Sequence, residues 1–305
     1  MSPPWHGGLL MIDAQALTLR LGGRWWRRYG TAPCPVCQPE GRRSQAALTL
    51  ADGERGRLLA HCKKTHCGFT DILAAAGIGA GDYRPPDTLE LARREAERRA
   101  QARRTTFRAS LAWKEAVAIE GTPAARYLRK ARGISCPLPA TLRFHPRAWH
   151  GSTATRHPAL IALVEGGNGF AVHRTYLRAD GSGKAPLEPA KAMLGAVSGG
   201  AVRLSDAPGP LVVAEGIETA LSLASGLLRT PGTVWAALST SGVRSLRLPS
   251  EPDRLVIAAD GDPAGRAAAH DLAERAHALR WAVSLLPAPD GRDWNDILMM
   301  KGARA

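Results

Sequence analysis

Two short acidic segments in the second half of the chain each follow an apolar run. Glu215 comes directly after the run 211–214, and the sequence Asp-Gly-Asp at 260–262 comes directly after the run 255–259. In an open parallel sheet, functional groups collect beyond the carboxyl ends of the strands, so two such strands direct three carboxylates to one point. Hard cations such as Mg²⁺ prefer carboxylate oxygens as ligands. The pattern therefore predicts a divalent-metal site suited to phosphoryl transfer.

Cysteines in the first half of the chain have the spacing of a metal site. They form a C-x₂-C pair and a second, wider pair, and they are Cys34, Cys37, Cys62 and Cys67. Thiolates on two turns complete a closed tetrahedral shell around Zn²⁺, and a disulfide pair is less common in a cytosolic protein. His61 and His66 lie beside the second pair, and the spacing alone leaves open whether either replaces a thiolate.

The residues around the acidic segments resemble the Toprim domain of topoisomerases and bacterial primases. The matching segments are 213–220 (VAEGIETA) and 259–268 (ADGDPAGRAA), and 291–296 (GRDWND) is similar to the closing acidic segment of DnaG-type primases. The resemblance implies that Glu215, Asp260 and Asp262 are catalytic and bind Mg²⁺ or Mn²⁺, with Asp293 and Asp296 as further ligands. The chain departs from the family at Thr219, where an acid is usual, and Glu218 precedes it.

The cysteine segment and the middle of the chain extend this resemblance to about residues 30 to 300. Cys67-Gly68 and the segment after it resemble the last knuckle and helix of primase zinc ribbons, which favours an all-cysteine zinc site. Phage and plasmid primases join such a ribbon to a Toprim domain. In the middle, where only order and pattern match, the basic residues Arg174, Lys184 and Lys191 are candidates for binding template or nucleotide phosphates.

Charge is spread unevenly along the chain. Residues 1–150 hold 25 Lys and Arg against 12 Asp and Glu, a net +13, and residues 151–305 hold 16 against 15, a net +1, which together give the overall +14. A basic half joined to a near-neutral half suits a protein that binds a polyanion. The candidate contacts near the cysteines are Trp25, Arg27, Arg28, Lys63 and Lys64. A general Arg bias and packed aromatic anchors are the alternative explanations.

The pattern of elements predicts an α/β protein with four parts. We expect a zinc-ribbon nucleic-acid-binding domain at 1–85, a basic helical linker at 86–120, an α+β lobe at 121–208 and a mainly parallel Toprim domain at 209–305. Short strands are expected at 46–50 and 58–61, a long Arg-rich helix at 88–117, and a β-meander from 158 to 177. No apolar run approaches the roughly 20 residues that cross a bilayer, and no signal-peptide pattern is present, so we expect a cytoplasmic protein without a membrane partner.

These features together predict a DNA primase, a DNA-directed RNA polymerase that makes short RNA primers on single-stranded DNA by metal-dependent nucleotidyl transfer. Its partners would be the template, ribonucleoside triphosphates and a separate replicative helicase. One alternative is a Toprim nuclease. The other is a catalytically inactive relative that binds single strands or recruits a helicase, and Thr219 in place of the usual acid keeps that alternative open.

Overall fold

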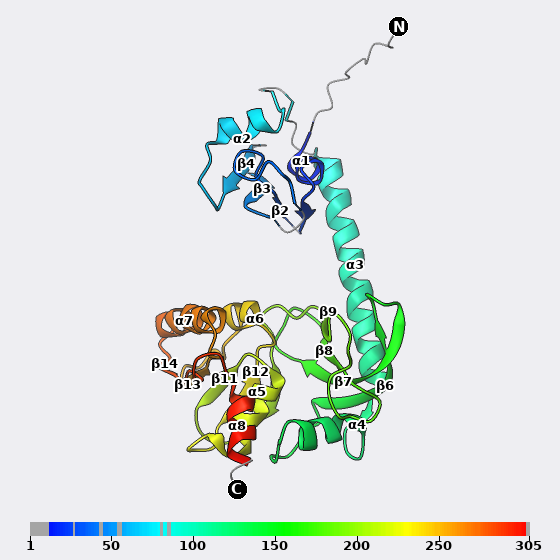
Figure 1. The fold of residues 1–305 in the computed structure, drawn as a ribbon, viewed down its shortest axis with the longest axis vertical. Helices are drawn as coiled ribbons and strands as arrows, with labels where there is room; N and C mark the ends of the chain where they lie inside the picture. The colour runs from blue at the N-terminus through cyan, green and yellow to red at the C-terminus, as the bar shows by residue number, and fades with distance from the viewer. Residues whose placement is uncertain are drawn as a thin grey trace. The chain divides into compact units, whose positions relative to one another are not determined.

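The computed structural model describes residues 12–26, 28–42, 45–53, 57–79, 82–83 and 87–302. The chain forms two compact units, residues 1–100 and residues 101–305, and the boundary falls within the long helix α3 (Thr88–Glu115; Figure 1). None of the helices in these ranges combines the length and the apolar character that crossing a membrane requires.

The first unit is built on a small antiparallel sheet. Its strand order is β1 (Arg24–Trp25), β2 (Gly30–Ala32), β3 (Leu48–Asp52) and β4 (Leu58–Cys62). Helix α1 (Ala14–Arg20) begins at the N-cap Asp13, and α2 (Phe69–Ala75) follows the last cysteine. Alternate side chains of β3 and β4 point into a core with α1 and α2, because successive strand residues face opposite sides of a sheet. The predicted strands at 46–50 and 58–61 therefore exist, shifted by two residues or fewer.

Helix α3 matches the predicted Arg-rich helix. Its first half carries surface ion pairs at helical spacing, such as Arg93 with Glu97 at 3.1 Å and Arg99 with Glu95 at 3.0 Å. Such exposed pairs stabilise a helix only slightly, because solvent and salt screen their charges. Arg94 also reaches Asp13 at 2.6 Å, which connects the start of α3 to the cap of α1 within the first unit.

The first sheet of the second unit is an antiparallel meander. Its order is β5 (Val117–Ala118), β6 (Leu142–His150), β7 (Thr155–Val164), β8 (Ala171–Tyr176) and β9 (Lys191–Gly195). One face packs on the C-terminal half of α3 through residues such as Ile161 and Val172. The short α4 (Pro123–Arg126) continues into a π-helical turn at Tyr127–Ala131.

The second sheet is mainly parallel. Its order is β10 (Val202–Ser205), β12 (Thr233–Ala236), β11 (Leu211–Ala214), β13 (Arg254–Ala258) and β14 (Ala282–Leu285), and only β10 runs antiparallel to its neighbour. The helices of this part are α5 (Ile217–Ser222), which a π-helical turn at Leu223–Leu227 follows, α6 (Thr240–Ser245), α7 (Pro263–Ala278) and α8 (Trp294–Gly302). The core with α6 and α7 contains Val213, Ile257 and Leu272.

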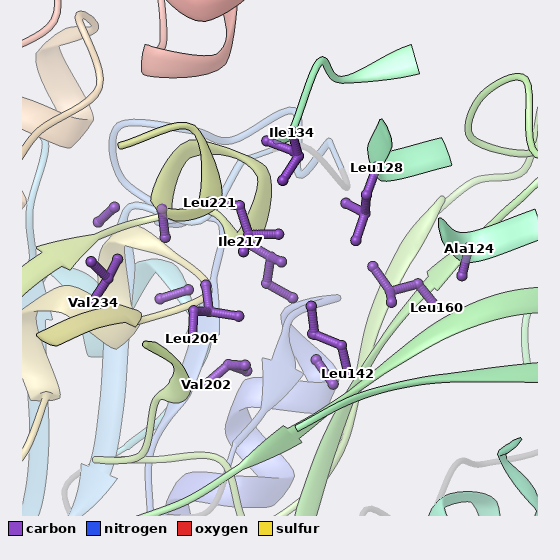
Figure 2. Close-up of a cluster of buried hydrophobic side chains, with 14 of the residues drawn as sticks. Ala124, Leu128, Ile134, Leu142, Leu160, Val202, Leu204, Ile217, Leu221 and Val234 are labelled. Carbon is purple, nitrogen blue, oxygen red and sulfur yellow. The ribbon is translucent and has the colours of Figure 1, made fainter. Parts of the chain in front are cut away.

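One apolar core joins the two sheets of the second unit. Leu142 and Leu160 of the meander and Leu128 of the π-helical turn share it with Ile217 and Leu221 of α5 (Figure 2). Burying each such side chain stabilises the fold by about 1.5–3 kcal/mol. The two sheets therefore cannot separate without exposing a large apolar surface, and the site described next is built on this shared support.

Candidate functional site: an acidic cluster beside two lysines

The parallel pairing of β11 and β13 brings the two acidic segments to one edge of the sheet. Ala214 lies opposite Ala258 in register, so Glu215 and Asp260 follow the ends of adjacent strands. The charge of Glu215 also acts on Asp260, because it contributes to raising the pKa of Asp260. This is the arrangement that the sequence predicted from two strands ending in carboxylates.

Asp260 is the most perturbed carboxyl of the cluster. Burial and the negative charges of Glu215, Asp293 and Asp262 together raise its pKa to about 7. Its Oδ1 atom is buried without a hydrogen-bond partner. Burial and the charge of Asp262 likewise raise the pKa of Glu215. A half-buried carboxylate with one buried, unpartnered oxygen among like charges fits a divalent cation, which would supply the missing positive charge.

The other three acids of the prediction cap helices. Asp262 is the N-cap of α7 and accepts a hydrogen bond from the Gly265 N–H at 2.6 Å. Asp293 and Asp296 exchange bonds at the start of α8, since Asp293 Oδ1 accepts from the Asp296 N–H at 2.8 Å and Asp296 Oδ2 accepts from the Asp293 N–H at 3.1 Å. Asp293 acts on Asp260 electrostatically, whereas Asp296 is exposed.

Two of the three predicted phosphate-binding residues lie together and the third does not. Lys191 and Lys184 both approach the carboxylate of Glu218, at 2.9 Å and 3.5 Å. Lys191 also lowers the pKa of Asp260, so its ammonium group faces the acidic cluster. Arg174 of β8 lies on the face of the meander opposite to Lys191 of β9. It donates a hydrogen bond to the Trp149 carbonyl oxygen at 2.8 Å. Period-two alternation along the strand explains this separation.

Sequence reasoning missed the role of Glu218, which is fully buried in α5. Tyr127 donates to its Oε1 at 2.8 Å, and Arg132 donates to the Tyr127 hydroxyl at 3.0 Å. The positive charges of Lys191 and Lys184 outweigh burial and hold the pKa of Glu218 far below its usual range. The available signal was an ionisable residue between Ile217 and Leu221, inside a helix whose residues are otherwise apolar or small.

The four cysteines of the first unit converge. Their sulfur atoms all lie within 4.8 Å of one another. In the ranges that the structure describes, no other three His, Cys, Asp or Glu side chains lie this close together, so the acids that follow β11 and β13 would have to draw closer to share one cation. His61 and His66 stand outside the group as exposed neighbours, with ring centroids 5.7 Å apart. The cysteines alone therefore form the ligand set that the structure assembles.

The backbone around Cys62 suits a metal-bound thiolate. Burial opposes ionisation of this thiol, but the N–H groups of Thr65, Cys67 and Lys64 outweigh it and lower the pKa of Cys62 to about 5. Hydrogen bonds to the charged form favour that form, and metal ligation requires it. The donor set of four sulfurs and the tight turns that present them fit a structural Zn²⁺ ion.

The predicted nucleic-acid contacts of the first unit separate into packed and exposed residues. Trp25 packs against the core, whereas Trp26 is 45% exposed. The Arg24 guanidinium lies 5.5 Å from the Trp26 ring centroid, and the indole N–H donates to Thr31 Oγ1 at 3.1 Å. Arg28, Lys63 and Lys64 are exposed, and Arg27 lies outside the described residues.

Comparison with known proteins identifies the C-terminal part of the chain. Residues 210–304 match the Toprim domain family, so this part of the chain is a Toprim domain, as its sequence indicated. Residues 101–204 match a domain family of unknown function, which covers the meander and the end of α3. The search of curated proteins found no match.

Three solved structures are similar to the chain. A DNA primase domain from Pseudomonas aeruginosa is 18% identical with a TM-score of 0.37, over 66% of this chain and 77% of that one. The zinc-binding and RNA polymerase domains of the Aquifex aeolicus primase are 12% identical with a TM-score of 0.39, over 92% and 78%. The RNA polymerase domain of Mycobacterium tuberculosis primase DnaG is 17% identical with a TM-score of 0.35, over 68% and 81%.

Proposed function

We propose that this protein is a DNA primase, which makes short RNA primers on single-stranded DNA by metal-dependent nucleotidyl transfer in the cytoplasm. The observation that carries the proposal is the acidic edge of the Toprim domain, where Glu215 and the half-buried Asp260, whose Oδ1 has no hydrogen-bond partner, follow adjacent parallel strands. Phosphoryl transfer requires mainly positioning and neutralisation of charge, and this edge offers ligands for the ions that neutralise it.

The chain's own residues take distinct roles in this proposal. Asp260 and Asp262 would hold the cations, and Glu215 would be a further ligand or accept the proton of the attacking 3′-hydroxyl, with the three carboxylates drawn closer together than they lie in this structure. Asp293 and Asp296 would be outer ligands of the cations. Mg²⁺ or Mn²⁺, when bound, supplies the positive charge that polarises the phosphoryl group. Lys184 and Lys191, whose ammonium groups lie at the Glu218 carboxylate, would bind the phosphates of a ribonucleoside triphosphate.

The first unit would hold the template. Zn²⁺ bound by Cys34, Cys37, Cys62 and Cys67 would stabilise its small sheet. The exposed cations Arg28, Lys63 and Lys64 and the exposed indole of Trp26 suit a single strand, which is bound through its phosphates and by stacking of its bases. A separate helicase would open the duplex.

A single gel assay tests the proposal. Purified protein is incubated with Mg²⁺ or Mn²⁺, mixed single-stranded templates and labelled ribonucleotides, beside the variants Asp260→Asn and Asp271→Asn. Asp271 is the matched control, because it is an exposed aspartate of α7 that pairs with Arg244 of α6 at 2.5 Å. We expect short template-dependent products from the wild type and from Asp271→Asn, and none from Asp260→Asn.

The other outcomes distinguish the alternatives. Shortened template without added nucleotides would identify a Toprim nuclease. Intact template that binds tightly at low salt, with no product in any reaction, would identify the inactive binding module, and its affinity should fall steeply as salt rises. Product formation that survives Asp260→Asn would remove the acidic edge from the mechanism.

A further inference from the structure

Glu218 of the Toprim domain is surrounded by groups from the preceding part of the second unit. Its Oε1 accepts from Tyr127 and faces Lys184, and its Oε2 accepts from Lys191. Tyr127 belongs to the π-helical turn, and Lys191 is the first residue of β9. The contacts of one carboxylate therefore connect two parts of the chain that the shared apolar core also holds together.

We infer that Glu218 is a positioning residue, which holds the ammonium groups of Lys184 and Lys191 where they bind the phosphates of an incoming nucleoside triphosphate. The inference rests on the proposed function and assigns a role to a residue that does not itself contact the substrate. This role explains why the carboxylate of Glu218 lies near Glu215 and Asp260 without being one of the predicted metal ligands.

The exposure of the three side chains supports this role. Side-chain exposure is 7% for Glu218, 32% for Lys184 and 37% for Lys191. The carboxylate is thus hidden while both ammonium groups reach solvent. An ammonium group has three N–H donors. Lys191 gives one of them to Glu218 and Lys184 forms only an ion pair with it, so each lysine keeps donors for a phosphate oxygen. If Glu218 only neutralised the lysines, their ammonium groups would not need to remain exposed to solvent.

The net charge of these three side chains supports the same role for Glu218. Two lysines face one carboxylate, so the group retains a positive charge beside the acids. Lys191 also lowers the pKa of Glu215 and of Asp260, so its positive charge acts on the acidic cluster as well as on Glu218. A nucleoside triphosphate held at the acidic cluster would present phosphate oxygens to this ammonium group.

A network of hydrogen bonds connects Glu218 to neighbouring side chains and to its own helix. Arg132 donates to the Tyr127 hydroxyl and also approaches Asn295 Oδ1 at 3.3 Å. The Asn295 side chain donates to Ser222 Oγ at 2.9 Å, and the Ser222 hydroxyl donates to the Glu218 carbonyl at 2.7 Å. Side chains fixed by a second set of hydrogen bonds hold a binding group within the narrow geometry that catalysis needs.

Kinetics of Glu218→Gln test the inference, because the amide keeps the volume and the acceptor for Tyr127 but removes the charge. We expect the KM for ribonucleotides to rise about tenfold, the loss of one charge-assisted contact, while kcat changes less than about threefold. In a Lys184→Ala/Lys191→Ala background, Glu218→Gln should have no further effect on KM. Asp271→Asn is the control for loss of a surface carboxylate.

Three results would overturn the inference: an unchanged KM, a lower KM caused by freed lysines, or an effect that persists without the lysines. If Glu218→Gln fails to fold in a thermal melt, Lys191→Gln gives the same test, and an unchanged KM in that variant contradicts the inference. If the wild type makes no product, the proposed function has failed. Binding of ATP with a fluorescent ribose label in Mg²⁺ then still shows whether Glu218→Gln weakens nucleotide affinity, and unchanged affinity contradicts the inference.

Discussion

The N–H of Gly261 donates to the carbonyl oxygen of Arg292 at 2.8 Å. This bond connects the loop that carries Asp260 and Asp262 to the loop that carries Asp293. A Cβ atom on Gly261 would lie only 1.9 Å from the Pro289 carbonyl oxygen. The approach of the two acidic loops therefore depends on a residue without a side chain.

Gly261→Ala should separate the acidic loops. Because the obstructing atoms are backbone carbonyls, the loops must move apart, and we expect a loss of about 1–3 kcal/mol in the free energy of unfolding. Nucleotidyl transfer should fall by about a hundredfold or more, since misplacement of about 1 Å has an effect of that size. Gly183→Ala is the matched control, because a Cβ there has open space. Equal activities of the two variants would show that the loop approach is not required.

The strands that end in acids could be predicted from sequence because each is a short run of apolar residues that an acid and a glycine soon follow. The structure confirms β11 and β13, and the mixed α/β architecture with a C-terminal Toprim domain. Strands β10 and β12 were not predicted, because four-residue segments such as Val202–Ser205 lack a distinct period. Their place in the sheet depends on partners distant in sequence.

The site was harder to predict than the fold. Glu215 and Asp260 follow from strand ends, but the partnership of Glu218 with Lys184 and Lys191 joins residues 27 or more positions apart. Arg174 was grouped with these lysines because it is basic and near them in sequence. Strand register, which decides the face of β8 that it occupies, is set by tertiary packing and is not visible in composition.

Removal of one cysteine should release the metal of the first unit. Cys62→Ser removes a thiolate that backbone N–H groups favour, so we expect loss of bound zinc and loss of structure in the first unit. His61→Ala and His66→Ala should keep one zinc per chain, because both rings lie outside the sulfur group. Metal analysis and far-ultraviolet circular dichroism measure both effects. Zinc loss in either histidine variant would contradict the all-cysteine set.

The two neighbouring tryptophans should differ in effect. Trp26 and Arg24 line a cavity of about 600 Å³, so Trp26→Ala should weaken single-stranded DNA binding about tenfold, the loss of one base stack. Trp25→Ala should instead lower the melting temperature of the first unit, because its ring packs on the core. Fluorescence anisotropy with a labelled oligonucleotide, at two salt concentrations, measures the first effect. Wild-type affinity in Trp26→Ala would remove the stacking role.

Buried His173 should make the second unit sensitive to acid. Burial lowers its pKa from the ordinary 6.5 to about 4, and the charges of Lys191, Arg174 and Lys184 add to this while Glu218 opposes it. The folded protein keeps His173 neutral in a pH range where the unfolded chain binds a proton. Stability is therefore retained above pH 6.5 and lost progressively as the pH falls toward 4.

The variant His173→Gln should remove this part of the acid sensitivity. Between pH 6.5 and 4 the wild type should lose about 2–3 kcal/mol more of its free energy of unfolding than the variant does, because each tenfold difference in proton affinity between the unfolded and folded states is equivalent to about 1.4 kcal/mol. Urea unfolding of the full chain at several pH values measures the difference. His277→Gln, at an exposed position of α7, is the control, because this variant keeps every other acid-dependent change of the wild type, including loss of zinc. Parallel curves for the wild type and His173→Gln would mean that His173 is protonated in the folded state, and that the lysines do not act on it as the structure indicates.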